Sequence, residues 1–300
     1  MPQVRFWGVR GSIPTPGFET ARYGGNTSCV TVEPDPIAEG GPTELFILDA
    51  GSGLRVLGLD LLKQKRLPIR AHVLLTHTHW DHIQGFPFFA PAFIPGNELT
   101  VFGAAGSEED LQTTLAGQML HRYFPVSLEQ LGATIRFADV QPGSRLIGSA
   151  LVTAAALNHP GKTVGYRVEL DGCSVAYVTD CEPLGSLPDL QSDPGVLALA
   201  RHADVLIHDA QYTDAEYPAK VGWGHSPISY VVDVALAAGA KQLVLFHHDP
   251  LRVDEQMDAL VEQARERAQG SDLQIVAAAE GTTIELAGSA EKSGELIAAG

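Results

Sequence analysis

Short apolar runs, each ended by a polar or Gly/Pro cluster, recur along this chain of 300 residues. Such runs predict buried strands, and they alternate with stretches in which apolar residues recur at helical spacing. The predicted strands cover residues 4–9, 28–32, 45–48, 72–76, 99–103, 134–140, 151–157, 164–170, 174–179, 204–207, 242–246, 273–278 and 282–286. The predicted helices cover residues 54–65, 107–121, 195–202, 227–238 and 254–268. This alternation of strands and helices predicts an α/β fold.

Local signals refine the ends of these elements. Ser52 and Ser226 stand just before two predicted helices, and we expect their hydroxyls to cap those helices. The last two predicted strands are separated by a short turn, so we expect them to pair as a hairpin. The small, polar stretch 288–300 predicts a disordered tail, and we therefore expect one domain over residues 1–287.

Composition narrows the class of protein. The apolar fraction is 45%, enough for a full core, and no run of eighteen apolar residues predicts a membrane span. The beginning of the chain lacks the pattern of a signal peptide. The three cysteines have no paired spacing, which favours reduced thiols and a cytoplasmic location. A net charge of −16 disfavours a broad surface for polyanions.

Candidate metal ligands crowd into residues 77–82, which read His-Thr-His-Trp-Asp-His. The cluster follows a predicted buried strand, where open α/β folds place their chemistry. His77 and His79 point the same way if the extended backbone persists, so they can bind one ion. Asp81 and His82 follow the turn and are better placed for a second ion. Imidazole and carboxylate donors without a cysteine cluster favour zinc, manganese or iron over a closed structural zinc site.

Three more donors, His159, Asp180 and His247, each end a predicted strand further along the chain. Strand ends share an edge in a layered sheet, so residues far apart in sequence can converge there. His248 and Cys181 are neighbouring alternatives, although side chains of adjacent residues on an extended segment point apart.

The motif at 77–82 resembles the His-x-His-x-Asp-His signature of the metallo-β-lactamase-fold hydrolases. The loops at 10–17 and 23–27 are similar to the amino-terminal segment of the branch that holds ribonuclease Z and phosphonate-pathway phosphodiesterases. The resemblance covers nearly the whole chain and implies a four-layer αβ/βα sandwich with two divalent metals at one edge.

The resemblance also implies the ligand set. One metal would be held by His77, His79 and His159, the other by Asp81, His82 and His247, with Asp180 bridging them. It favours His247 over His248, and Asp180 over a Cys181 ligand. We expect Asp49 and His208, which also end strands, to orient ligands from outside this set.

Two metals suit hydrolysis of a phosphodiester, because they generate hydroxide near neutral pH and clamp the oxygens of an in-line displacement. We expect Asp81, besides its role as a ligand, and His225 to be catalytic. His225 precedes a predicted helix and matches a histidine of the phosphodiesterase relatives, where it would protonate the leaving alkoxide. Asn26 and Ser226 are candidate substrate-binding residues.

The sequence therefore predicts a dinuclear phosphodiesterase for small or cyclic phosphodiesters, with zinc or manganese as cofactor and iron as an alternative. A thioester or lactone hydrolase on the same fold remains an alternative, and so does an RNA-processing endonuclease of the ribonuclease Z type. Ribonuclease Z relatives carry a basic, Gly/Pro-rich arm for RNA, and this sequence shows no such insertion. We therefore do not expect a nucleic-acid partner, with a short RNA as the one exception left open. A flavodiiron-like redox protein fits less well, because its relatives carry glutamate where this chain has His79. We expect no membrane partner, and the sequence leaves a homodimer open.

Overall fold

Two seven-stranded sheets face each other in the computed structural model, which describes residues 1–34, 41–104, 110–184 and 194–287. The first sheet has the strand order β14-β1-β2-β3-β4-β5-β6 and the second the order β13-β12-β11-β10-β9-β8-β7. The first sheet consists of β1 (Gln3–Gly8), β2 (Cys29–Glu33), β3 (Thr43–Leu48), β4 (Ile69–Leu74), β5 (Glu98–Ala104), β6 (Thr134–Val140) and β14 (Thr283–Glu285). The second consists of β7 (Gly143–Ile147), β8 (Ala150–Leu157), β9 (Thr163–Leu170), β10 (Cys173–Val178), β11 (Val205–Asp209), β12 (Gln242–Phe246) and β13 (Gln274–Ala277).

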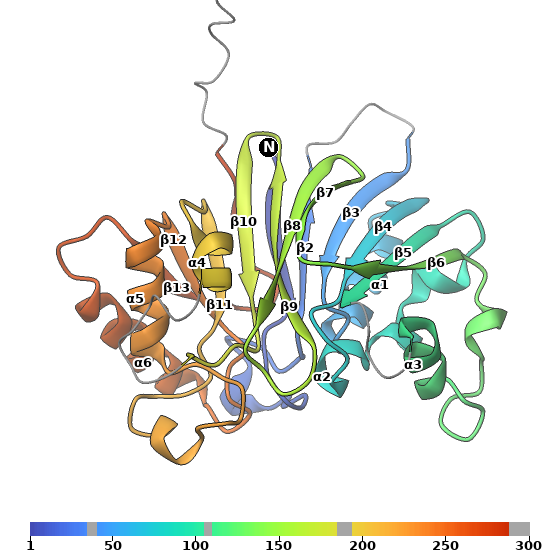
Figure 1. Ribbon diagram of the computed structural model, residues 1–300. Helices are drawn as coiled ribbons and strands as arrows, with labels where there is room; N and C mark the ends of the chain where they lie inside the picture. The colour runs from blue at the N-terminus through green and yellow to red at the C-terminus, as the bar shows by residue number, and fades with distance from the viewer. Residues whose placement is uncertain (35–40, 105–109, 185–193, 288–300) are drawn as a thin grey trace, which may run out of the picture.

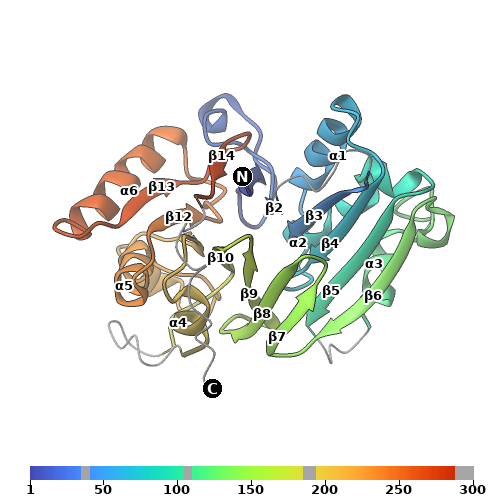
Figure 2. The ribbon, with the colours of Figure 1, turned by 90° about the horizontal axis from the view of Figure 1, so that it is seen from above.

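Helices cover the outer face of each sheet, as Figures 1 and 2 show. The α-helices are α1 (Gly53–Lys63), α2 (Trp80–Ile83), α3 (Leu111–Gln118), α4 (Pro194–Ala200), α5 (Ile228–Ala238) and α6 (Asp254–Arg267). Helices α1 and α3 lie beside the first sheet, while α4, α5 and α6 lie beside the second. Short 3-10 helices include η2 (Phe86–Phe88) and η6 (Tyr217–Ala219). The order helix, sheet, sheet, helix confirms the predicted αβ/βα sandwich.

Three apolar cores separate these four layers. Strand residues that point inward, such as Phe46 and Phe246, fill the space between the two sheets. Leu57 of α1 belongs to the core outside the first sheet, and Val231 of α5 to the core outside the second. Because side chains alternate along a strand, each buried strand contributes to two cores at once, which explains its continuous apolar run.

Strand direction brings the predicted ligands to one edge. Strands β3 and β4 are parallel to each other, and so are β10, β11 and β12. Strand β8 runs the same way as β10, because β9 between them is antiparallel to both. The carboxyl ends of these strands therefore meet at one edge of the sandwich, at the bottom of Figure 1.

Several local predictions were wrong. The Ser52 hydroxyl makes no cap and instead accepts from the Thr27 backbone N–H at 2.9 Å. Helix α5 begins after Pro227, and the Ser226 hydroxyl donates to the Cys181 carbonyl at 2.6 Å. The predicted final hairpin does not form, because β13 pairs with β12 and β14 pairs with β1 of the other sheet.

Two other predictions fall partly or wholly outside the described residues. Of the helix predicted over 107–121, residues 107–109 are not described, and α3 begins after Asp110, whose carboxylate accepts from the Thr113 N–H at 2.7 Å. The predicted tail at 288–300 is likewise not described. Among the described residues, no helix has both the length and the apolar character needed to cross a membrane.

Candidate metal centre

The seven predicted ligands lie just beyond the carboxyl ends of four strands. His77 and His79 follow β4, and Asp81 and His82 lie on α2, the next element. The others follow β8, β10 and β12, respectively; they are His159, Asp180 and His247. Asp180 and His247 have left-handed backbones with φ of 55° and 59°, and Asp49, which follows β3, has φ of 59°. This conformation is uncommon outside glycine and concentrates at functional sites.

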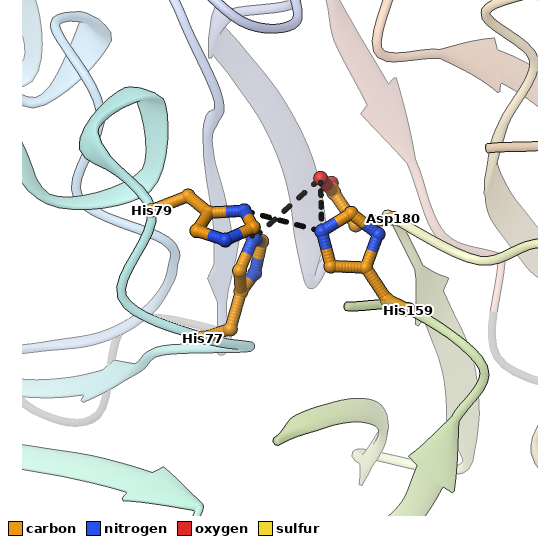
Figure 3. A group of neighbouring side chains, drawn as sticks. All are labelled: His77, His79, His159 and Asp180. Atoms are coloured by element: carbon orange, nitrogen blue, oxygen red, sulfur yellow. Dashed lines mark hydrogen bonds and ion pairs between the residues drawn. The ribbon is translucent and has the colours of Figure 1, made fainter. Parts of the chain in front are cut away.

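The first group of donor atoms joins both sheets (Figure 3). It consists of His77, His79, His159 and Asp180, whose donor atoms lie within 4.8 Å of one another. The Nδ1 atom of His79 is 2.8 Å from Nε2 of His77 and 3.1 Å from Nε2 of His159. Asp180 Oδ2 is 3.6 Å from the same His77 nitrogen. Three imidazoles and a carboxylate thus converge on one point.

The second group lies beside the first and shares Asp180 with it. It consists of Asp81, His82, Asp180 and His247, all buried. Nε2 of His247 lies 3.2 Å from Asp81 Oδ2 and 3.2 Å from Asp180 Oδ1. One carboxylate therefore offers Oδ2 to the first group and Oδ1 to the second.

The outward ring nitrogens of four of these histidines are all occupied by hydrogen-bond partners. The partners are Thr76 Oγ1 for His77 at 3.1 Å, Asp49 for His82 at 2.8 Å, the Gly224 carbonyl for His159 at 2.9 Å, and Gln211 Oε1 for His247 at 2.9 Å. A carbonyl or carboxylate oxygen only accepts, and the Thr76 hydroxyl already donates to Asp49 at 3.0 Å, so in each neutral ring Nδ1 carries the hydrogen and Nε2 presents its lone pair to the centre. This orientation of imidazoles by outer acceptors is typical of metal sites.

The surroundings of the buried His82 Nε2 atom show whether the site suits a cation. It lies 3.1 Å from Asp180 Oδ1 and 3.2 Å from Asp81 Oδ2, yet the angles do not satisfy a hydrogen bond. Although burial disfavours a charged ring, Asp180, Asp81 and Asp49 together raise the pKa of His82 well above its usual value. The site thus attracts positive charge to the space between two carboxylates, and the donor set suits a divalent metal ion.

The amino-terminal loop completes the wall of the second group. The Ser12 backbone N–H donates to Asp81 Oδ2 at 2.8 Å. Gly11 packs so closely on the His247 ring that an added Cβ would overlap its atoms. The loop at 10–17 therefore contacts the centre directly.

His225 lies over both groups without belonging to either. Its ring stacks on His247, with centroids 4.9 Å apart, and meets His159 edge-on at 5.3 Å. Nδ1 is 2.8 Å from Asp209 Oδ2. Burial opposes charging of the ring, but Asp209 outweighs it and raises the pKa of His225 to about 9. Asp209, His225 and His247 form a third close group among the described residues.

Other predicted residues lie elsewhere or have internal partners. His208 points into the helix layer, where its ring meets Tyr230 at 6.2 Å, so it does not orient a ligand as predicted. The Asn26 amide donates to Glu280 at 2.9 Å, and Ser226 is fully buried. Both side chains are thus held by internal hydrogen bonds, since the Ser226 hydroxyl donates to the Cys181 carbonyl, contrary to the predicted substrate-binding roles.

The neighbouring alternatives to two ligands also point away. Nε2 of His248 donates to the Ala278 carbonyl at 2.8 Å, and burial lowers the pKa of His248 to about 3. The Cys181 thiol is buried in the core outside the second sheet. Asp49, by contrast, contacts His82 as predicted for an orienting residue.

Sequence reasoning missed three polar residues that support the centre. Asp209 and Gln211 bind His225 and His247. Glu182 accepts from the backbone N–H groups of Gly222 and Gly224 at 2.7 and 2.8 Å, which fixes the carbonyl that orients His159. The signal for Asp209 is its position at a strand end, directly beside His208.

Comparisons with known proteins place the chain in a family and support its fold. A family model described as a beta-lactamase superfamily domain matches residues 45–248. Ribonuclease BN of Cronobacter sakazakii is 23% identical over 316 residues, covering 90% of this chain and 97% of that protein.

Two solved structures share the fold along nearly their whole length. YhfI of Bacillus subtilis, a metallo-beta-lactamase fold protein, aligns with a TM-score of 0.65 and 18% identity over 94% of this chain and 98% of that one. A diphosphatase from the PhnP family aligns with a TM-score of 0.64 and 19% identity over 95% and 98% of the two chains. The predicted fold is confirmed.

Proposed function

The chain belongs to the beta-lactamase superfamily and is a metal-dependent hydrolase with the metallo-β-lactamase fold, and from this premise we propose that it cleaves small or cyclic phosphodiesters. The observation that carries the proposal is the His225–Asp209 pair beside the two donor groups. A phosphodiester releases an alkoxide, which needs a proton, and a histidine held over the centre by Asp209 can donate it.

Each donor group would hold one divalent ion, zinc or manganese. Under this proposal one ion is held by His77, His79 and His159, the other by Asp81, His82 and His247, and Asp180 contributes one oxygen to each. When bound, such ions supply hydroxide near neutral pH and stabilise charge on phosphoryl oxygens. Asp81 is at once a ligand and the acceptor of the Ser12 N–H, which holds its carboxylate in place.

His225 would act as the general acid from Nε2. Asp209 fixes the ring by accepting the hydrogen of Nδ1, so the opposite nitrogen is the one left to donate. The His225 ring stacks on the ring of His247, a proposed metal ligand, and this contact keeps it over the centre. The proton then passes from His225 Nε2 to the oxygen of the leaving group.

A second candidate is an RNA-processing endonuclease, which the likeness to ribonuclease BN supports. The reaction would be the same, but the substrate would be a polyanion. A net charge of −16 opposes long-range attraction of RNA. Small phosphodiesters are therefore the preferred substrate class, and RNA is one arm of the test.

The proposal predicts preferential hydrolysis of phosphodiesters by the zinc- or manganese-loaded protein. Bis(p-nitrophenyl) phosphate should be cleaved faster than p-nitrophenyl phosphate, and faster than a thioester or a lactone. A precursor transfer RNA, assayed alongside, separates the two candidates. Robust thioesterase activity without diesterase activity would refute the proposal, and preference for the RNA would favour the second candidate.

The same assay tests the role of His225. General acid catalysis contributes about a hundred- to ten-thousand-fold, so His225→Ala should lose rate on that scale with an alkyl leaving group and far less with nitrophenolate. His202→Ala is a matched control, since this exposed histidine precedes β11 at the opposite edge. Loss of metal from His225→Ala, read by elemental analysis, would make His225 a ligand. Equal loss on both diesters would make it a positioning residue.

A further inference from the structure

A cavity of about 520 Å³ opens beside the metal centre, and four aromatic rings contribute to its lining. The rings belong to Trp80, Phe88, Tyr123 and Phe124, and we call this cavity the aromatic pocket. Its volume falls within the range of small-molecule sites. None of the contacts described for the metal centre uses these rings.

The aromatic pocket and the metal centre share helix α2 and the loop before it. Thr78 and Trp80 line the pocket and flank His79, whose Nδ1 faces the first donor group. Along α2, Asp81 and His82 point to the second group, while Ile83 lines the pocket. Residues that line the pocket are therefore direct neighbours in sequence of residues that face the centre. A substrate whose phosphate is at the centre can place a substituent in the pocket.

The rings of the pocket are unusually exposed for their size. Trp80 is 78% exposed, Tyr123 69% and Phe88 54%, although a folded chain gains by burying such surface. Phe88 also meets Phe124 edge-on, with centroids 5.3 Å apart. Exposed apolar surface gathered around a cavity marks a binding site, whereas single scattered residues do not.

The remaining lining selects the chemistry of the occupant. Among the described residues, none of the side chains that line the pocket carries a charge at neutral pH. Gln84 and Gln118 are anchored, because their amides donate to Thr27 at 3.0 Å and to the Ile83 carbonyl at 3.1 Å. Rings for stacking and fixed amides at the edge suit a flat, uncharged group with polar edges better than an alkyl chain.

We propose that the aromatic pocket binds an uncharged aromatic substituent of the substrate, up to the size of a nucleobase, while the phosphate occupies the metal centre. This inference rests on the proposed function for the reacting group and adds the substrate class. Stacking on Trp80, Phe88 or Tyr123 would provide affinity independent of the anion.

Three phosphonates test the pocket without turnover. Methyl-, phenyl- and hexylphosphonate share one anionic group, and phenyl and hexyl share a carbon number. Calorimetric titration of the metal-loaded protein should show phenylphosphonate binding about tenfold tighter than methylphosphonate, and tighter than hexylphosphonate. In Tyr123→Ala and Phe88→Ala the phenyl advantage should fall several-fold, while binding of methylphosphonate stays unchanged. Leu146→Ala, which removes a side chain that is 78% exposed on β7, is the control.

Each contrary outcome overturns the proposal. Hexylphosphonate binding as tightly as phenylphosphonate would indicate an aliphatic occupant. Equal affinities for phenyl- and methylphosphonate, or no binding of any of them, would exclude the pocket from substrate recognition. Tyr123 is largely exposed, so Tyr123→Ala keeps the test valid if Phe88→Ala fails to fold. Diesterase activity is measured separately, so failure of the pocket and failure of the proposed function are distinguishable.

Discussion

The two sheets supply the metal centre in different ways. The first sheet contributes four donors within six residues, His77, His79, Asp81 and His82, on one loop and the helix that follows it. The second contributes His159, Asp180 and His247, each at the end of a different strand. The first half depends on local geometry, and the second depends on the registers of the sheet.

The residues that orient the ligands also differ between the two halves of the centre. In the first half one carboxylate has several partners: Asp49 accepts from Thr76 N–H at 2.8 Å, from His82 at 2.8 Å and from Tyr177 at 3.0 Å. In the second half separate loops orient separate ligands, through the carbonyl of Gly224 and the amide of Gln211. We infer that damage to one support of the second half stays local, whereas damage to Asp49 spreads.

The largest expected effect comes from the one residue that joins the halves. Asp180→Ala removes a carboxylate shared by both donor groups, so metal content should fall from about two ions to below one per chain. Bound metals supply several kcal/mol of transition-state stabilisation, so diesterase activity should fall about a thousandfold or more. Elemental analysis and rates on bis(p-nitrophenyl) phosphate measure both, with the exposed Asp272→Ala as control. Full metal content in Asp180→Ala would show that the two groups are independent of it.

The contrast between the halves also explains what the sequence could predict. The motif at 77–82 and the strand ends were readable, because hydrophobic runs mark strands and parallel strands share an edge. Asp209 was missed because β11 continues through it, and alternation turns His208 into the helix layer. Sequence patterns say where a strand is, but not at which residue it stops.

Contacts between residues far apart in sequence were the second thing that the sequence could not predict. Asn26 and Ser226 were expected to face substrate, yet Glu280 and the Cys181 carbonyl bind them. The strand β14 leaves β13 and pairs with β1, so the expected hairpin fails for the same reason. Left-handed backbones at Asp49, Asp180 and His247 are also set by the surrounding structure. Tertiary contacts override local signals at these positions.

A smaller effect should follow from loosening a single support. Gln211→Ala removes the acceptor for His247 Nδ1, and loss of such an orienting contact typically weakens metal binding about ten- to a hundredfold. Only one of the two ions should be affected, because His77, His79 and His159 do not contact Gln211. Metal titration against a competing chelator measures the two affinities, with the exposed Gln64→Ala as control. Equal weakening of both ions would contradict the local character of the second half.

The smallest expected effect on the metals is at His248, next to a ligand in the chain. Its side chain points away from the centre, with Nε2 donating to the Ala278 carbonyl at 2.8 Å. Burial lowers its pKa to about 3, so the ring is neutral at physiological pH and cannot alter the charge of the site. His248→Gln keeps an amide donor for that carbonyl and should leave metal content unchanged. His247→Gln should lose one ion, because Nε2 of His247 faces Asp81 and Asp180 at 3.2 Å. Elemental analysis of the two variants side by side decides the assignment, and loss of an ion from His248→Gln alone would transfer the ligand to His248.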